Sequence, residues 1–163
     1  DLINSLRLHG KGSEKYDNVR IGLNSRLDTI QAAILIEKLK IFPNELVLRN
    51  KVAENYTSNL SSSLITPIVM QDTRSAWAQY TLVVDDRETI QKKMLQSNIP
   101  FGVYYPKALS QQSGYKQFPR VSTGLGVSET LSSKVLSLPM HPYITDDFYS
   151  EIKTVLKSKT ISN

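Results

Sequence analysis

The residues that could do chemistry are concentrated in one stretch near the start of the chain, residues 21–33. Gly22 allows the backbone to turn, Asn24 and Arg26 present an amide and a guanidinium, and an apolar helical pattern begins directly after them. The N–H groups at the start of a helix bind anions such as phosphate, and a guanidinium binds a diphosphate or a carboxylate through two parallel hydrogen bonds. The stretch therefore predicts an anion-binding turn. The alternative is purely structural, with Asn24 or Asp28 capping the first turn of the helix.

The same stretch carries a resemblance to a known family. Residues 22–33 read Gly-x-Asn-x-Arg-Leu-Asp-x-x-Gln-Ala-Ala, which is close to a signature of the DegT/StrS sugar aminotransferases. Three further segments agree in the same order: Ala78-Gln79-Tyr80-Thr81, Gly102-Val103-Tyr104-Tyr105-Pro106-Lys107 and Leu136-Ser137-Leu138-Pro139-Met140-His141-Pro142. Nearly the whole chain thus resembles the C-terminal portion of these enzymes. They depend on pyridoxal 5'-phosphate (PLP) and have the aspartate-aminotransferase fold, fold type I.

The resemblance implies binding roles for four residues. Asn24 matches an asparagine that reaches the phosphate of the PLP held by the neighbouring subunit, and Arg26 matches an arginine associated with the nucleotide-sugar substrate. Tyr104 and Tyr105 lie where relatives contact the sugar from the partner subunit. Because side chains alternate along a strand, only one tyrosine can face a given side. The structural alternatives are a helix cap and a salt bridge for the first pair, and one buried and one merely exposed tyrosine for the second.

The resemblance also implies that the catalytic lysine lies outside this chain. Transamination by PLP needs a lysine that holds the cofactor and an acid beside its pyridine nitrogen, and in the family both precede the segment that begins at Asp1. No lysine here has a matching context, so we assign no catalytic residue. The first residue is not methionine. We therefore expect a piece of a longer polypeptide that is inactive alone.

These features together predict the C-terminal portion of a nucleotide-sugar aminotransferase. It would move an amino group from glutamate to a keto-sugar on a UDP or dTDP carrier, for bacterial surface polysaccharides or other amino sugars. The resemblance implies a cytoplasmic homodimer with shared active sites. One alternative is a PLP-dependent sugar dehydratase of the same family, in which histidine replaces the lysine. Another is a binding or regulatory module without catalysis.

The composition excludes several other classes. The formal charge is +5, but the 20 lysines and arginines are scattered, whereas nucleic-acid-binding proteins usually gather such charge in a patch. The longest apolar run, residues 32–36, is too short to span a membrane. The chain has no cysteine, which excludes disulfides. It has only two histidines, so a metal site would depend on carboxylates. We expect neither nucleic acid, nor membrane, nor metal as a partner.

Apolar spacing predicts two helices in the first third of the chain. Residues 1–9 read as a short helix end with Gly10 as a left-handed C-cap. Residues 27–42 have a broad apolar stripe and should be largely buried. Pro43 should end that helix and begin another that reaches Leu60, with Leu46, Arg49, Ala53, Tyr56 and Leu60 at helical spacing.

The rest of the chain predicts a small sheet with helices. Strands are expected at 65–69, 77–84 and 99–105, a helix capped by residues 85–86 over 87–97, and a loop-rich excursion over 107–126. Helices over 128–136 and after Thr145 or Asp146 flank an extended segment at 138–142. The fold class is therefore α/β with an α+β small domain: long linking helices, then a mainly antiparallel sheet with helices. Residues 1–42 would end the large PLP-binding domain and begin the linking helices, and 43–163 would form the small C-terminal domain.

Overall fold

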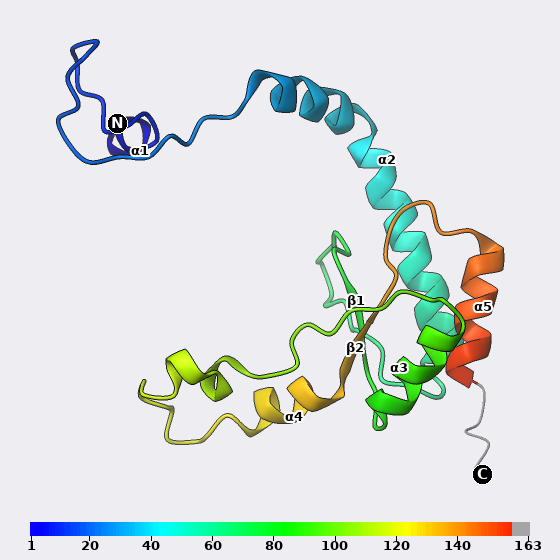
Figure 1. The fold of residues 1–163 in the computed structure, drawn as a ribbon. Coiled ribbons are helices and arrows are strands. Elements are labelled where there is room, and N and C mark those ends of the chain that lie inside the picture. Colours follow the sequence, from blue (N-terminus) through cyan, green and yellow to red (C-terminus); the bar gives the residue numbers. More distant parts are fainter. Residues whose placement is uncertain (158–163) are drawn as a thin grey trace. The chain divides into compact units, whose positions relative to one another are not determined.

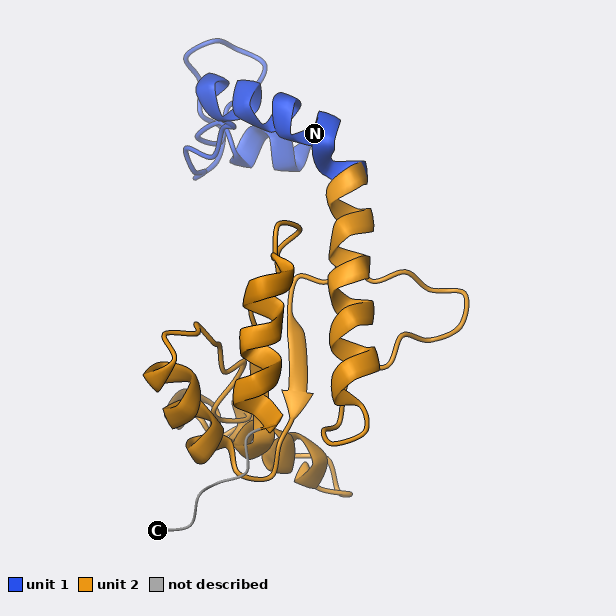
Figure 2. Ribbon diagram, turned by 90° about the vertical axis from the view of Figure 1, so that its right-hand side faces the viewer, with its two compact units in different colours: residues 1–43 blue, residues 44–163 orange. Residues whose placement is uncertain are grey.

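The computed structural model of the chain describes residues 1–157, which fall into two compact units (Figure 1). Figure 2 colours the first unit, Asp1–Pro43, and the second unit, which starts at Asn44. In the first unit the only buried residue is Gly10, whereas a cluster of thirteen buried apolar side chains lies entirely in the second. The apolar core of the described residues therefore belongs to the second unit.

Helix α1, Leu2–Leu6, opens the first unit, and the chain then folds back along it. Leu8 bridges Asn24, and the backbone N–H of Leu23 bonds to the Leu6 carbonyl at 2.7 Å. A Cβ atom on Gly22 would overlap the backbone of residues 6–10, so the glycine permits this close approach. Gly10 is left-handed, with φ of +79°, but the C-cap prediction was wrong, because α1 ends at Leu6 with Arg7 as its cap.

The predicted break at Pro43 was wrong, because Pro43 lies inside one continuous helix, α2, Thr29–Leu60. Proline removes one backbone hydrogen bond and crowds the carbonyl four residues earlier, which costs about 3 kcal/mol. The turns that follow bury Val52, Ala53, Tyr56 and Leu60 in the core. Tertiary packing of this kind outweighs a local breaking signal.

The predicted burial of residues 27–42 was also wrong for the described residues. The apolar side chains of this part of α2 are exposed, among them Ile30 at 73% and Leu39 at 64%. The stripe exists in the sequence, but nothing within residues 1–157 covers it. Among these residues no helix is both long and apolar enough to cross a membrane.

The second unit is built around an antiparallel pair of strands, β1, Tyr80–Val83, and β2, Val135–Leu138. The register pairs Tyr80 with Leu138 and Val83 with Val135. Ile65 bridges the outer side of β1, and Gly102 bridges the outer side of β2. The mainly antiparallel sheet was predicted correctly, although the expected strands at 65–69 and 99–105 are reduced to these single bridges.

Strand β2 was not predicted, because residues up to Leu136 were assigned to a helix. Helix α4, Gly126–Lys134, ends directly before it. Val135 to Leu138 is short and apolar, and such a run does not reveal its type by periodicity. Pairing with β1 makes it a strand, and Leu136, Ser137 and Leu138 are all buried.

Helices cover one side of the strand pair and form the core with it (Figure 1). Helix α3 runs over Arg87–Gln96 and helix α5 over Asp146–Lys157. Their caps match the expectation, since Asp86 accepts the Thr89 N–H at 3.0 Å and Thr145 Oγ1 accepts the Phe148 N–H at 3.3 Å. Two short 3₁₀ helices, Leu109–Gln111 and Ser113–Tyr115, lie in the predicted excursion.

Candidate functional site

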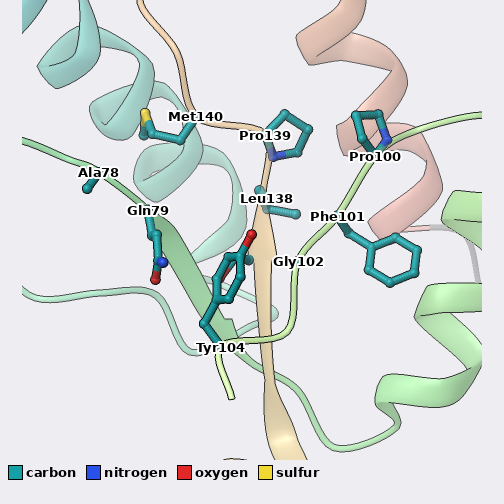
Figure 3. A pocket seen from close by; sticks show the side chains of 10 residues that line it. Ala78, Gln79, Pro100, Phe101, Gly102, Tyr104, Leu138, Pro139 and Met140 are labelled. Carbon is teal, nitrogen blue, oxygen red and sulfur yellow. The ribbon is translucent and has the colours of Figure 1, made fainter. Parts of the chain in front are cut away.

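Three segments that are far apart in the sequence meet at a cleft of about 330 Å³ in the second unit (Figure 3). We call it the Tyr104 cleft. Its lining comes from the residues before β1, from the segment beside β2, and from the end of β2 with the residues after it: Ala78, Gln79, Pro100, Phe101, Gly102, Tyr104, Ser137, Leu138, Pro139 and Met140. The three later segments that carry the family resemblance thus each contribute to one cavity.

The cleft forms where the strand pair ends. The last paired residues are Tyr80 and Leu138, so residues 78–79 and 139–140 continue beyond the ladder. On the outer side of β2, Gly102 and Ser137 exchange two backbone hydrogen bonds, at 3.0 and 2.7 Å. These bonds hold the segment that carries Tyr104 beside β2.

Alternation along residues 101–104 directs Tyr104 to the cleft. Val103 packs against the core, and the next side chain along, Tyr104, lines the cavity. Phe101 packs against the core and also borders the cavity. Its ring lies against Gly102, where an added Cβ atom would be 2.5 Å from Tyr104 Cε2 (Figure 3). Tyr105 does not line the cavity and is 69% exposed, compared with 47% for Tyr104, and the two rings meet edge to face at 5.9 Å.

The lining of the Tyr104 cleft is neutral and mixed in polarity. It has no charged side chain, and its polar groups are the Gln79 amide, the Tyr104 hydroxyl and the Ser137 hydroxyl. Ser137 is buried and already shares a 2.8 Å hydrogen bond with the Thr81 hydroxyl. A lining that mixes hydrogen-bonding and apolar groups without a charged side chain suits an uncharged hydroxylated ring better than a phosphate or carboxylate, which would lack a counter-charge there.

Asn24 and Arg26 lie in the first unit, where both are exposed. Asn24 pairs through its backbone with Leu8, and within residues 1–157 neither side chain makes a hydrogen bond or an ion pair. Asp28, not Asn24, caps α2, because its carboxylate accepts the N–H groups of Ile30 at 2.9 Å and Gln31 at 3.3 Å. The helix cap, which the sequence left open between Asn24 and Asp28, is therefore Asp28, and anion binding by Asn24 and Arg26 stays a prediction.

The residues present fit part of a PLP site. The exposed Asn24 amide and Arg26 guanidinium, both without a partner in the described chain, can donate hydrogen bonds to phosphate oxygens. No lysine lines the Tyr104 cleft, so nothing in it could hold the cofactor's carbonyl carbon. The described residues contain no cluster of three or more potential metal ligands.

Two residues that hold the cleft, Arg49 and Tyr56, were assigned only to a helical face by the sequence. Arg49 Nη1 donates to the carbonyls of Trp77 and Met140, and the Tyr56 hydroxyl donates to the Pro139 carbonyl. The available signal was an arginine at a position that the helical spacing assigned to the apolar face. His141, by contrast, is exposed, and its Nδ1 accepts the Tyr143 N–H at 3.2 Å within a turn.

Comparison with known proteins agrees with the resemblance noted in the sequence. The sequence profile of the DegT/DnrJ/EryC1/StrS aminotransferase family matches residues 1–157. A crystal structure of such an aminotransferase from Brucella abortus superposes with a TM-score of 0.90 and 43% identity, covering 95% of this chain and 42% of that one. This solved structure and the present chain therefore share a fold over nearly all of the latter.

Two curated relatives are similar over most of this chain. A UDP-2-acetamido-2-deoxy-3-oxo-D-glucuronate aminotransferase of Pseudomonas aeruginosa is 40% identical over 143 residues, which are 87% of this chain and 39% of that protein. A dTDP-3-amino-3,6-dideoxy-alpha-D-galactopyranose transaminase of Aneurinibacillus thermoaerophilus is 31% identical, over 97% and 42%. The chain thus spans about two fifths of the length of these relatives. With the profile match over residues 1–157, these likenesses show that the chain belongs to the DegT/DnrJ/EryC1/StrS aminotransferase family.

Proposed function

We propose that this chain is the C-terminal portion of a PLP-dependent nucleotide-sugar aminotransferase. The enzyme transfers an amino group from glutamate to a keto-sugar, as a step in making amino sugars for bacterial surface polysaccharides. The observation that carries the proposal is the neutral Tyr104 cleft, where all three later family segments meet around Gln79 and Tyr104. Membership of a family of PLP-dependent aminotransferases supports the chemistry, and the names of the two relatives support a sugar on a nucleotide carrier.

The four predicted residues and Gln79, which the structure adds, divide the ligand between them. Tyr104 and Gln79 bind hydroxyl groups of the sugar ring, and Tyr105 borders the ring from outside the cavity. Asn24 donates to the phosphate of the PLP held by a partner subunit in a homodimer with shared sites. Arg26 binds the diphosphate or a uronate carboxylate, for which a planar guanidinium is suited.

This chain's contribution to the reaction is binding and orientation. When bound, PLP supplies the electrophile and the electron sink for amino transfer, and a lysine outside this chain holds it. The cleft positions the keto carbon by fixing the ring around it. Such positioning contributes to the rate because it removes translational and rotational freedom before the chemical step.

The two halves of the reaction provide the test, in the full-length polypeptide that contains this chain. Glutamate should convert bound PLP to pyridoxamine phosphate, followed by absorbance, and a keto-sugar nucleotide should reverse the change. Failure of glutamate to convert the cofactor would contradict an aminotransferase. Loss of water from the sugar without glutamate would instead indicate the dehydratase.

Arg26→Ala tests the nucleotide assignment. We expect the KM for the nucleotide sugar to rise by roughly tenfold, about 1.4 kcal/mol, with the glutamate half-reaction unchanged. Arg74→Ala is the matched control, because Arg74 is also an exposed arginine but lies in the second unit outside every predicted binding segment. An unchanged KM in Arg26→Ala removes Arg26 from the site.

A further inference from the structure

The second half of α2 binds the backbone on both sides of the Tyr104 cleft. Arg49 Nη1 donates to the Trp77 carbonyl at 2.9 Å and to the Met140 carbonyl at 3.2 Å. Two turns further along the helix, the Tyr56 hydroxyl donates to the Pro139 carbonyl at 3.0 Å. Trp77 directly precedes the cleft residue Ala78, and Met140 lines the cleft itself.

The position of Arg49 follows from the end of the strand ladder. Beyond Tyr80 and Leu138, no backbone hydrogen bond joins residues 75–79 to residues 139–142. No backbone N–H of the described residues bonds to the carbonyl of Trp77 or of Met140, and buried backbone groups need partners. One guanidinium nitrogen donates to both carbonyls, so it joins the two segments beyond the end of the ladder.

The chemistry of Arg49 is unusual for a half-buried charge. Within residues 1–157 it forms no ion pair, and its two hydrogen bonds go to neutral carbonyls. The guanidinium is planar and its donors have fixed directions, whereas a lysine ammonium is a point charge on a flexible stem. An arginine at this position therefore sets a definite geometry for the two carbonyls.

The neighbouring residue on α2 fixes the same segment from its side chain. Trp77 is 8% exposed, and its Nε1 donates to Asn50 Oδ1 at 3.1 Å. The amide of Asn50 in turn donates to the Leu46 carbonyl at 2.7 Å and the Ser75 carbonyl at 3.4 Å. The indole and the carbonyl of Trp77 are thus held by two adjacent residues of α2, Asn50 and Arg49.

We propose that Arg49 is a positioning residue for the Tyr104 cleft. By holding the carbonyls of Trp77 and Met140 on one nitrogen, it fixes the separation of the two segments that present Ala78, Gln79 and Met140 to the ligand. It thereby sets the width of the cleft and its selectivity for the ring that enters. The identity of that ring as a keto-sugar rests on the proposed function, but the positioning of the two segments does not.

The test uses Arg49→Gln, Arg49→Lys and the control Lys51→Gln in the full-length polypeptide. Lys51→Gln removes one positive charge from the same turn of α2, but Lys51 is exposed and binds neither carbonyl. We expect Arg49→Gln to raise the KM for the nucleotide sugar roughly tenfold while the glutamate half-reaction stays within about twofold. Arg49→Lys should raise this KM less than Arg49→Gln does, and Lys51→Gln should have the same KM as the unmodified enzyme.

A structural role alone gives a different pattern. Equal losses in both half-reactions with a lowered Tm, or an unchanged KM in a folded Arg49→Gln enzyme, would overturn the proposal. If Arg49→Gln does not fold, Arg49→Lys decides, because it keeps the charge and length but loses the planar fork. An unchanged KM in the folded lysine variant likewise overturns the proposal.

A second measurement separates this proposal from the proposed function. Trp77 is the only tryptophan of the chain, so 5-fluorotryptophan gives it one ¹⁹F resonance, assigned in a longer polypeptide by Trp77→Phe. Arg49→Gln should shift and broaden this resonance, and Lys51→Gln should not. If the enzyme turns over no nucleotide sugar, the proposed function fails while the resonance still reports on Arg49. A resonance that does not move in Arg49→Gln overturns the positioning role.

Discussion

The place of the Tyr104 ring depends on the absence of a side chain at Gly102. A methyl group there would meet the ring at Cε2, 2.5 Å away, and at the hydroxyl oxygen, 2.8 Å away. Tyr104 is half exposed, so its ring can rotate outward at little cost to stability. Gly102→Ala should therefore leave Tm nearly unchanged while it moves the hydroxyl out of the cleft.

The consequence of Gly102→Ala should be measured as binding. We expect the KM for the nucleotide sugar to rise by about tenfold, as for loss of one well-placed contact. Gly126→Ala is the control, because a Cβ atom there meets nothing within 4 Å. Equal KM values for Gly102→Ala and Gly126→Ala would show that the Tyr104 ring does not contribute to binding.

The sequence could indicate the chemistry of single residues but not their partners. Alternation implied that only one of Tyr104 and Tyr105 faces the cleft, and the backbone pairing of Gly102 with Ser137 determines which one. The competition between Asn24 and Asp28 for the α2 cap was open, and Asp28 forms the cap. Arg49 could not be placed at all, because its two carbonyl partners lie 28 and 91 residues away.

Among the elements, α3 depends on a single capping carboxylate whose effect varies with pH. The hydroxyl and the backbone N–H of Thr89 bind Asp86 and lower its pKa below the usual value. A lowered folded-state pKa gives stability that is present above the unfolded pKa, about 3.9, and is lost as the pH falls through the folded pKa. This contribution should therefore be full at neutral pH and should disappear in acid.

Asp86→Asn tests this dependence, because asparagine also caps helices but does not titrate. Urea denaturation at several pH values gives the free energies of unfolding of the unmodified chain and of Asp86→Asn. The difference between these two free energies should be largest near pH 7 and should become smaller below about pH 4. Asp85→Asn is the companion variant, since the Asp85 pKa is lowered by Lys134 rather than by the helix. A difference in the free energy of unfolding that is constant from neutral to acid pH would contradict the capping role of the charged Asp86 carboxylate.

Elements with strong local signals were predicted, and those decided by tertiary contacts were not. The caps at Asp86 and Thr145 and the helices after them follow from side chains that bind their own first turn. The continuity of α2 through Pro43 and the identity of β2 depend on packing and pairing with distant segments. Local propensity is a weak guide in such places, because burial outweighs it.

In the whole molecule, buried apolar side chains are distributed unevenly between the two units. The second unit buries side chains from α2, α3, α5 and both strands in one cluster. The first unit carries a comparable apolar stripe on α2, including Ile34, Leu35 and Phe42, but leaves it exposed. Isolated helices of this length are marginal in water without tertiary packing. The first unit should therefore be the less stable part of the 163-residue chain.

Hydrogen exchange of backbone amides measures this difference directly. In the 163-residue chain, amides of residues 80–83, 135–138 and 52–60 should exchange slowly, because they open only with the core, while those of residues 30–42 should exchange orders of magnitude faster. In a longer polypeptide whose additional residues cover the apolar stripe, protection of residues 30–42 should rise and that of residues 80–83 should change little. Slow exchange of residues 30–42 in the 163-residue chain at low protein concentration would show that the first unit is stable without a cover. Protection that grows with protein concentration would instead show that a second copy of the chain covers the stripe.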